Sequence, residues 1–168
     1  MNDVLPYYRN TVPSILFSLA IAMLLTWLPW QGWALALRPD FVALVLLYWA
    51  THTPHKVGIG TAWVVGLLAD VADASLFGQH ALAYSALVLG SIIFKRRILM
   101  LDLSQQTMQV FPLLLVNYVL FAAIDWLAQG HFAWSYLAGC VTSAVLWLPL
   151  TVLLQALSRP RAPKADSL

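Results

Sequence analysis

The chain has 168 residues, of which 61% are hydrophobic and 10% are charged, and its net charge is +2. Soluble globular proteins carry roughly a quarter charged residues, whereas the mean hydropathy here is +0.79. This composition excludes an ordinary water-soluble enzyme, a disordered protein and a free nucleic-acid binder. A single cysteine also excludes an internal disulfide framework or a thiolate metal cluster. We therefore expect a membrane protein.

Six apolar stretches are candidates for membrane-spanning helices, each of which needs about 20 mainly apolar residues. Short polar or turn-forming stretches such as 52–56 and 95–97 separate them. We predict an all-α protein with one six-helix transmembrane domain over residues 1–157 and a flexible cytoplasmic tail over residues 158–168. The predicted spans cover residues 14–30, 33 or 41 to 51, 57–76, 78–94, 108–128 and 132–157.

The orientation follows from Lys and Arg, which favour the cytoplasmic side of a membrane. With the amino terminus inside and six spans, eight of the nine basic residues fall inside and only Arg38 falls outside. We therefore expect both termini in the cytoplasm. The first apolar run, followed by residues 34–36 (Ala-Leu-Ala), also imitates a signal peptide. Trp27, Trp30 and Trp33 fit an interfacial aromatic belt instead, so we expect this run to be kept as a span.

The second span contains a break. Residues 41–51 reach only about 17 Å as a helix, which is too short to cross. Pro39 and Asp40 both suit a helix start, because proline fits the first turn and an acid favours the positive end of the helix dipole. We expect the helix to begin there, after an irregular stretch that protein or a water-filled cavity must cover.

Charged residues gather in the outer half of the predicted bundle, where they are costly and usually face a cavity or a partner. Asp70 lies about 20 Å along its helix from Val57. The other charged residues on the same side are Arg38, Asp40, Asp73 and Asp125. An acid at a helix C-terminus is disfavoured by the dipole. We therefore predict that Arg38 pairs with Asp70, either as a buried structural ion pair or beside an outward-facing pocket for a ligand or a partner segment.

Small residues recur at every fourth position in the third and sixth predicted spans. Such stripes let helix backbones approach closely. The helix-packing residues that we predict are Gly58, Ala62 and Gly66 in the third span, and Ser135, Gly139 and Ser143 in the sixth.

The sequence gives little support for a catalytic site or a metal site. His52 and His55 would need further ligands to hold a metal ion, and none is near in the sequence. Asp70 and Asp73 have no nucleophile, base or phosphate cradle around them in the sequence. We predict no metal site, no cofactor and no enzymatic activity.

Several short stretches occur in an order and spacing that point to one family. They are LRPD (37–40), LLYW (46–49), PHKVGIGT (54–61), GLLADV (66–71) and LFGQHAL (76–82). Together they resemble the family of rod shape-determining protein MreD, in detail over residues 37–93 and in length and hydropathy over the whole chain. Phe77 is a mild departure, because the family often has leucine before the glycine that corresponds to Gly78.

The resemblance implies a multi-pass protein of the bacterial inner membrane that acts in cell elongation and lateral peptidoglycan synthesis. It implies a direct partner, MreC, and a wider complex with MreB, RodA and a class B penicillin-binding protein, besides membrane lipid and without nucleic acid. The implied fold is similar to the substrate-binding membrane subunits of energy-coupling-factor vitamin transporters, six helices around an outward-opening pocket. The positions that match the family's motifs are Arg38, Pro39, Tyr48, Trp49, His55, Lys56, Gly58, Gly60, Gly66 and Asp70.

Two functions remain open. The first is a non-enzymatic scaffold that binds MreC and organises the Rod complex, and the second is a small-molecule-binding subunit of a vitamin-type transporter. The residues that we predict to contact a partner or line a pocket are Arg38, Asp40, Tyr48, Trp49, Asp70 and Asp73.

Overall fold

The computed structural model describes residues 11–73, 75–130 and 135–158, and all regular secondary structure in these ranges is helical. Six long helices overlap the six predicted spans, and a short helix precedes the second of them. Their bounds are α1 (Thr11–Thr26), α2 (Trp33–Ala36), α3 (Phe41–His52), α4 (Ile59–Ala72), α5 (Gln79–Leu99), α6 (Leu103–Gln129) and α7 (Ser135–Ser158). The predicted tail beyond residue 158 lies outside the described residues.

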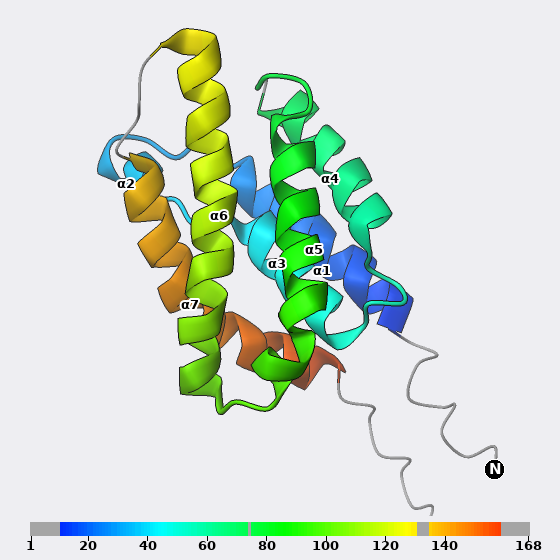
Figure 1. The fold of residues 1–168 in the computed structure, drawn as a ribbon. Helices are drawn as coiled ribbons and strands as arrows, with labels where there is room; N and C mark the ends of the chain where they lie inside the picture. Colours follow the sequence, from blue (N-terminus) through cyan, green and yellow to red (C-terminus); the bar gives the residue numbers. More distant parts are fainter. Residues whose placement is uncertain (1–10, 74, 131–134, 159–168) are drawn as a thin grey trace, which may run out of the picture.

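The six long helices run alternately in opposite directions along one bundle (Figure 1). The helix α5 packs between α4 and α6, α7 packs on the far side of α6, and α3 contacts both α1 and α5. The C-terminal ends of α1, α4 and α6 therefore lie at the end of the bundle that also carries α2, which we call the α2 end.

The centre of the bundle is α3. All ten residues from Val42 to Thr51 are buried, and a helix that is apolar all round belongs in the interior. As a helix, its 12 residues are only about 18 Å long. The short α2 and the turn before α3 extend this apolar segment to Trp33–His52.

The predicted break before α3 is confirmed. The helix starts at Phe41, and its N-cap Asp40 accepts a hydrogen bond from the backbone N–H of Ala43 at 2.9 Å. Pro39 has no backbone N–H, so it leaves no donor without a partner just before the helix. Residues 38–40 line a cavity, as described below.

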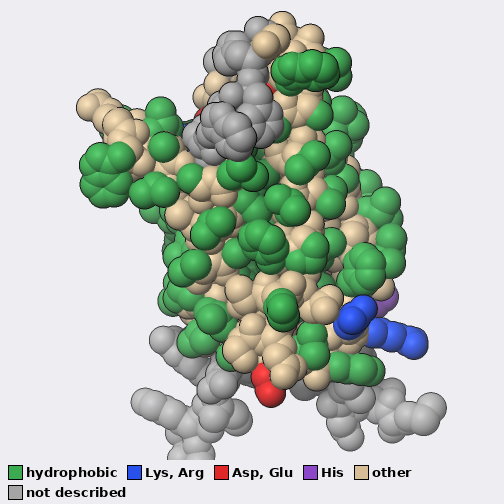
Figure 2. Space-filling model, turned by 60° about the vertical axis from the view of Figure 1, so that its left-hand side comes forward, with side chains coloured by type: hydrophobic (Ala, Val, Ile, Leu, Met, Phe, Trp, Pro, Cys, Tyr) green, Lys and Arg blue, Asp and Glu red, His purple; other side chains and the backbone are tan. Residues whose placement is uncertain are grey.

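The outside of the bundle is apolar. Large hydrophobic side chains are exposed on α1, α4, α5, α6 and α7, and hydrophobic side chains cover most of the face seen in Figure 2. Three segments of the described chain are long and apolar enough to cross a membrane, namely Trp33–His52, Leu103–Ala128 and Tyr136–Leu157. Two shorter apolar helices, Val12–Thr26 and Ile59–Ala72, accompany them.

Charges separate by sign between the two ends of the bundle. Within the described residues, four of the five aspartates lie toward the α2 end and one, Asp102, lies at the opposite end, between α5 and α6. The basic residues have the reverse distribution, with Arg38 at the α2 end and the others at the opposite end, namely Lys56, Lys95, Arg96 and Arg97. In Figure 2 the Lys and Arg side chains in view gather near the lower end.

Candidate functional site: a polar cavity at the α2 end

A partly open cavity of about 750 Å³ lies at the α2 end of the bundle. The helices α1, α2, α5, α6 and α7 contribute to its wall, and so do the N-cap of α3 and the C-cap of α4. Three of the described lining residues are aspartates and one is an arginine. The polar lining residues are Thr26, Arg38, Asp40, Asp73, Ser75, Gln79, His80, Tyr84, Tyr118, Asp125 and Tyr136.

Arg38 holds the α1, α2 and α4 side of the cavity together. One guanidinium nitrogen donates to a carboxylate oxygen of Asp73 at 3.2 Å, and the other donates to the carbonyl of Thr26 at 3.2 Å. The predicted pair of Arg38 with Asp70 is therefore wrong, and the partner is one helical turn further along α4. Both side chains are about a quarter exposed, which leaves the Arg38–Asp73 pair in contact with the cavity.

Asp70 has a different role, because its carboxylate caps the next helix. It accepts hydrogen bonds from the backbone N–H of Gly78 at 2.8 Å and of His80 at 2.7 Å. These N–H groups belong to the start of α5, whose N-cap Gly78 has no side chain to bind them. The positive end of the α5 dipole thus offsets the unfavourable position of Asp70 near the end of its own helix, and the residue is buried.

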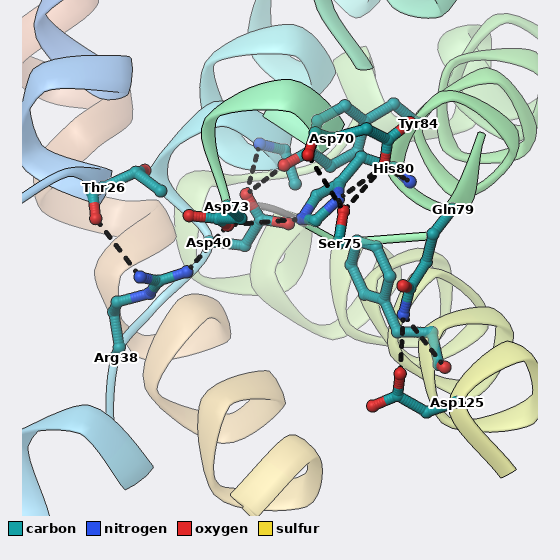
Figure 3. Close-up of polar contacts among 12 residues, drawn as sticks. Thr26, Arg38, Asp40, Asp70, Asp73, Ser75, Gln79, His80, Tyr84 and Asp125 are labelled. Atoms are coloured by element: carbon teal, nitrogen blue, oxygen red, sulfur yellow. Dashed lines mark hydrogen bonds and ion pairs between the residues drawn. The ribbon is translucent and has the colours of Figure 1, made fainter. Parts of the chain in front are cut away.

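His80 connects the two aspartates of α4 (Figure 3). Its Nδ1 lies 2.9 Å from Asp70, and its Nε2 lies 3.6 Å from Asp73. Ser75 also bonds to Asp70 and to His80. Arg38, Asp73, His80 and Asp70 therefore form one connected row from the cavity to the buried α4–α5 turn.

Asp40 forms the floor of the cavity at the start of α3. Besides capping that helix, its carboxylate accepts the hydroxyl of Tyr84 at 3.0 Å and the amide of Asn117 at 3.4 Å. Its backbone N–H donates to Tyr118 and to Ser143. Asp40 thereby ties α3 to α5, α6 and α7, so it lines the cavity as predicted and also holds the bundle together.

Asp125 lies on the other side of the cavity from Arg38 (Figure 3). The amide of Gln79 donates to it at 3.4 Å, and the hydroxyl of Tyr136 donates to it as well. These contacts join α5, α6 and the start of α7 around one carboxylate.

The structure corrects the prediction that Tyr48 and Trp49 line a pocket. Both are buried in α3 about two turns beyond Asp40, and neither reaches the cavity. Tyr48 stacks on His52, and the indole N–H of Trp49 donates to Ser18 at 2.9 Å. These side chains pack α3 against its neighbours.

The small residues of α4 differ in what they contact. A Cβ on Gly66 would lie 2.4 Å from Cα of Ala81, so α4 and α5 touch backbone to backbone there. Ala62, one turn earlier, is buried. Gly58 is instead the N-cap of α4, and a Cβ there would meet only the Pro54 carbonyl at 3.9 Å.

The small residues of α7 lie against the wall of the cavity. A Cβ on Gly139 would approach the Tyr118 ring to 3.1 Å and the Arg38 carbonyl to 3.2 Å. Ser143 is buried and bonds to the Tyr118 hydroxyl and the Asp40 N–H. Ser135 is the first residue of α7, and its side chain lies outside the described part.

Several residues of the site were not singled out from the sequence. They are His80, Gln79, Tyr84 and Tyr118, which all bond to, or line the wall beside, the predicted charges. Asp125 was expected on this side of the bundle but was not predicted as a site residue. The sequence offered one signal for these residues. Gly78 at the start of α5 has no side chain, so the first backbone N–H groups of that helix need an acceptor from another part of the chain. Among the described residues, no group of three or more His, Cys, Asp or Glu side chains is arranged to hold a metal ion.

Comparison with known proteins gives two matches. The family described as rod shape-determining protein MreD matches residues 8–157. The rod shape-determining protein MreD of Haemophilus influenzae is 31% identical over 149 residues, which are 87% of this chain and 91% of that protein. No solved structure matches the chain, so similarity to transporter subunits stays a prediction.

Proposed function

The chain belongs to the family of rod shape-determining protein MreD, and we propose on that premise that it is a non-enzymatic membrane scaffold of the bacterial elongation machinery. In this proposal it binds MreC directly and thereby organises a complex that includes MreB, RodA and a class B penicillin-binding protein. It lies in the inner membrane with both termini in the cytoplasm.

The observation that carries this proposal is the extent of the family match, which covers residues 8–157. A match of this length includes every helix of the bundle and both sides of the cavity. The apolar outer surface supports the membrane location, and the sign separation of charge supports the orientation, since Lys and Arg favour the cytoplasmic side.

The proposed mechanism uses two surfaces. Exposed apolar side chains of the helices offer packing surfaces to a partner's membrane helix, where close van der Waals contact drives association. The Arg38–Asp73 pair, which is part-exposed beside the mouth of the cavity, offers a charged contact to the partner's outer segment. Charged contacts of this kind give register and specificity more than affinity.

A complementation experiment tests the proposal. In rod-shaped cells that lack their own copy of this protein, wild type should restore rods, and Arg38→Ala and Asp73→Asn should give rounder cells at equal membrane abundance. Asp102→Asn and Arg96→Ala, exposed changes of the same kind at the opposite end, serve as matched controls and should restore rods. Full rescue by the Arg38 and Asp73 variants would contradict the role of this pair.

A second candidate rests on the volume of the cavity. About 750 Å³ falls within the range of small-molecule sites, which favours a solute-binding subunit like those of vitamin transporters. Such a subunit should retain a tightly bound small solute on purification and should require an energising ATPase partner, whereas the scaffold should retain a single-span protein.

A further inference from the structure

The ring of His80 is held between two carboxylates at the end of α4 (Figure 3). Its Nδ1 lies 2.9 Å from Asp70 Oδ1, and its Nε2 lies 3.6 Å from Asp73 Oδ2. The rings of Tyr84 and Phe121 pack against the imidazole, and only 14% of the His80 side chain is exposed. This packing fixes the directions in which the two ring nitrogens point.

Hydrogen-bond chemistry decides which ring nitrogens of His80 carry a proton. An ionised carboxylate only accepts hydrogen bonds, and a neutral imidazole has one donor nitrogen and one acceptor nitrogen. Nδ1 must be the donor, because two lone pairs 2.9 Å apart would repel each other. In the neutral ring Nε2 would then turn a lone pair toward Asp73. Only the imidazolium, in which both nitrogens donate, gives both carboxylates a donor.

Ser75 does not replace Asp70 as the partner of Nδ1. Its hydroxyl lies 3.1 Å from Asp70 Oδ1 and 3.2 Å from the Nδ1 of His80, and it has one proton to donate. If that proton went to Nδ1, the ring would face the Asp70 oxygen with no hydrogen between them. The hydroxyl therefore donates to Asp70, and Nδ1 keeps its own proton.

The charged surroundings of His80 are mainly anionic. Three carboxylates and one guanidinium lie around the ring, and the guanidinium already pairs with Asp73. The helix α6 presents Phe121 to the ring, and Asp125 of that helix is bonded to Gln79. A proton on His80 therefore adds a cation where anions are in excess. The charged and titratable groups around the ring are Asp70 and Asp73 at the end of α4, Asp40 before α3, Tyr84 of α5 and, beyond Asp73, Arg38.

We propose that His80 is a proton-binding site and a positioning residue for the Arg38–Asp73 pair. With the proton bound, charges alternate along the row Asp70, His80, Asp73 and Arg38, and both cations hold the same oxygen of Asp73, Oδ2. Without the proton, Nε2 no longer donates and only Arg38 holds that carboxylate. The consequence for binding rests on the proposed function: the pair is best ordered for a protein partner when the medium outside the membrane is mildly acidic.

Solid-state NMR of the ring nitrogens in the full chain, grown with isotope-labelled histidine, tests the proton site directly. The His80 signals are those that disappear in His80→Gln. Between about pH 5 and about pH 8, where histidine titrates, His80 should pass from two protonated ring nitrogens to one, and Nδ1 should be the nitrogen that keeps its proton. A neutral ring that carries its proton on Nε2, or a ring that stays neutral at the acidic end, would overturn the proposal.

Thermal unfolding of matched variants in one mild detergent tests the link between His80 and Asp73. The protonated ring gains Asp73 as a partner only in the folded chain, so this stabilisation is present at low pH and is lost as the pH rises. Asp73→Asn should therefore lower the unfolding midpoint more at about pH 6 than at about pH 8, by about 3 °C, as for one part-buried ion pair. This difference should disappear in a His80→Gln background and should persist with His55→Gln, a change at an exposed histidine. An equal effect of Asp73→Asn at both pH values would contradict the link.

Copurification of the protein partner at the same two pH values separates this site from the proposed function. Wild type should retain more partner at the lower pH, and His80→Gln should retain the same reduced amount at both. Equal retention by wild type at both pH values would contradict the positioning role. Absence of the partner at both, with the ring nitrogens and the unfolding midpoints as expected, would contradict the scaffold and support the proton site.

Discussion

At the scale of single residues, Asp70 and Asp73 show how three positions separate a structural acid from one that faces the cavity. Asp70 is fully enclosed and accepts two backbone N–H groups of α5. Asp73 is about a quarter exposed and pairs with Arg38. Sequence reasoning placed both in the right part of the bundle but could not distinguish them, because the turn between α4 and α5 decides which one faces inward.

We therefore expect Asp70→Asn and Asp73→Asn to have different effects. Asp70→Asn places an amide donor among N–H donors and should cost about 3 kcal/mol of unfolding free energy, as removal of one buried charge partner does. Asp73→Asn removes a part-exposed ion pair and should cost about 1 kcal/mol or less. Thermal unfolding of both variants in one mild detergent measures the difference. Equal losses would contradict the capping role of Asp70.

The Arg38–Asp73 pair can be tested by exchanging its charges. Arg38→Asp and Asp73→Arg alone each place like charges side by side, so each should impair cell-shape rescue. The double variant restores opposite charges and should recover part of the function. A double variant as defective as both single variants, with normal membrane abundance, would indicate that the pair does not act as a unit.

Among the described glycines, Gly66 leaves the least space for a side chain. An added methyl group would lie 2.4 Å from the backbone of Ala81, so Gly66→Ala must push α4 away from α5. We expect a loss of about 1–3 kcal/mol, as for other overpacked sites, seen as a lower midpoint of thermal unfolding. Gly60→Ala in the same helix meets nothing within 4 Å. That control should be neutral or slightly stabilising, and an equal loss in both variants would argue against close packing at Gly66.

At the scale of elements, the positions of the helices follow from the sequence, because long apolar stretches are separated by turn-forming and charged residues. The break before α3 follows as well, since Pro39 and Asp40 are strong helix-start residues. The rotation of each helix about its own axis does not follow from the sequence. Tyr48 and Trp49 lie in a run of ten buried residues, and a run that is apolar all round carries no periodicity to show which face meets a cavity.

Hydropathy also does not predict how α7 is attached to α3. Ser143 binds the N–H of Asp40 and the hydroxyl of Tyr118, both at 3.0 Å. Ser143→Ala should therefore cost about 1–3 kcal/mol by leaving buried polar groups without their partner. Thr142 bonds only to its own helix at Ala138 and Gly139, so Thr142→Ala should change the unfolding midpoint much less. The reverse order would show that α7 is held in another way.

At the scale of the whole molecule, the alternating helices bring four of the five described aspartates to one end and four of the five described basic residues to the other. This arrangement agrees with the six-span prediction, although only three segments reach the full length and hydropathy of a membrane span. The shorter α1 and α4, of about 24 and 21 Å, and the charged end of α5 explain the difference.

The orientation can be measured with single cysteines in a Cys140→Ala background. Leu76 lies between α4 and α5 at the α2 end, and Met100 lies between α5 and α6 at the opposite end. A membrane-impermeant thiol reagent added outside the cytoplasmic membrane should label Leu76→Cys in intact cells. It should label Met100→Cys only after permeabilisation. The opposite pattern would invert the topology and place the cavity on the cytoplasmic side.

The proposal that this chain works by holding a protein partner is best tested by copurification from native membranes in a mild detergent, with mass spectrometry of proteins and small molecules. We expect MreC to be recovered with wild type and with Asp102→Asn, and to be reduced by Arg38→Ala and Asp73→Asn at equal yield of the folded chain. Recovery of a stoichiometric vitamin-sized solute without MreC would contradict the scaffold and identify a solute-binding subunit.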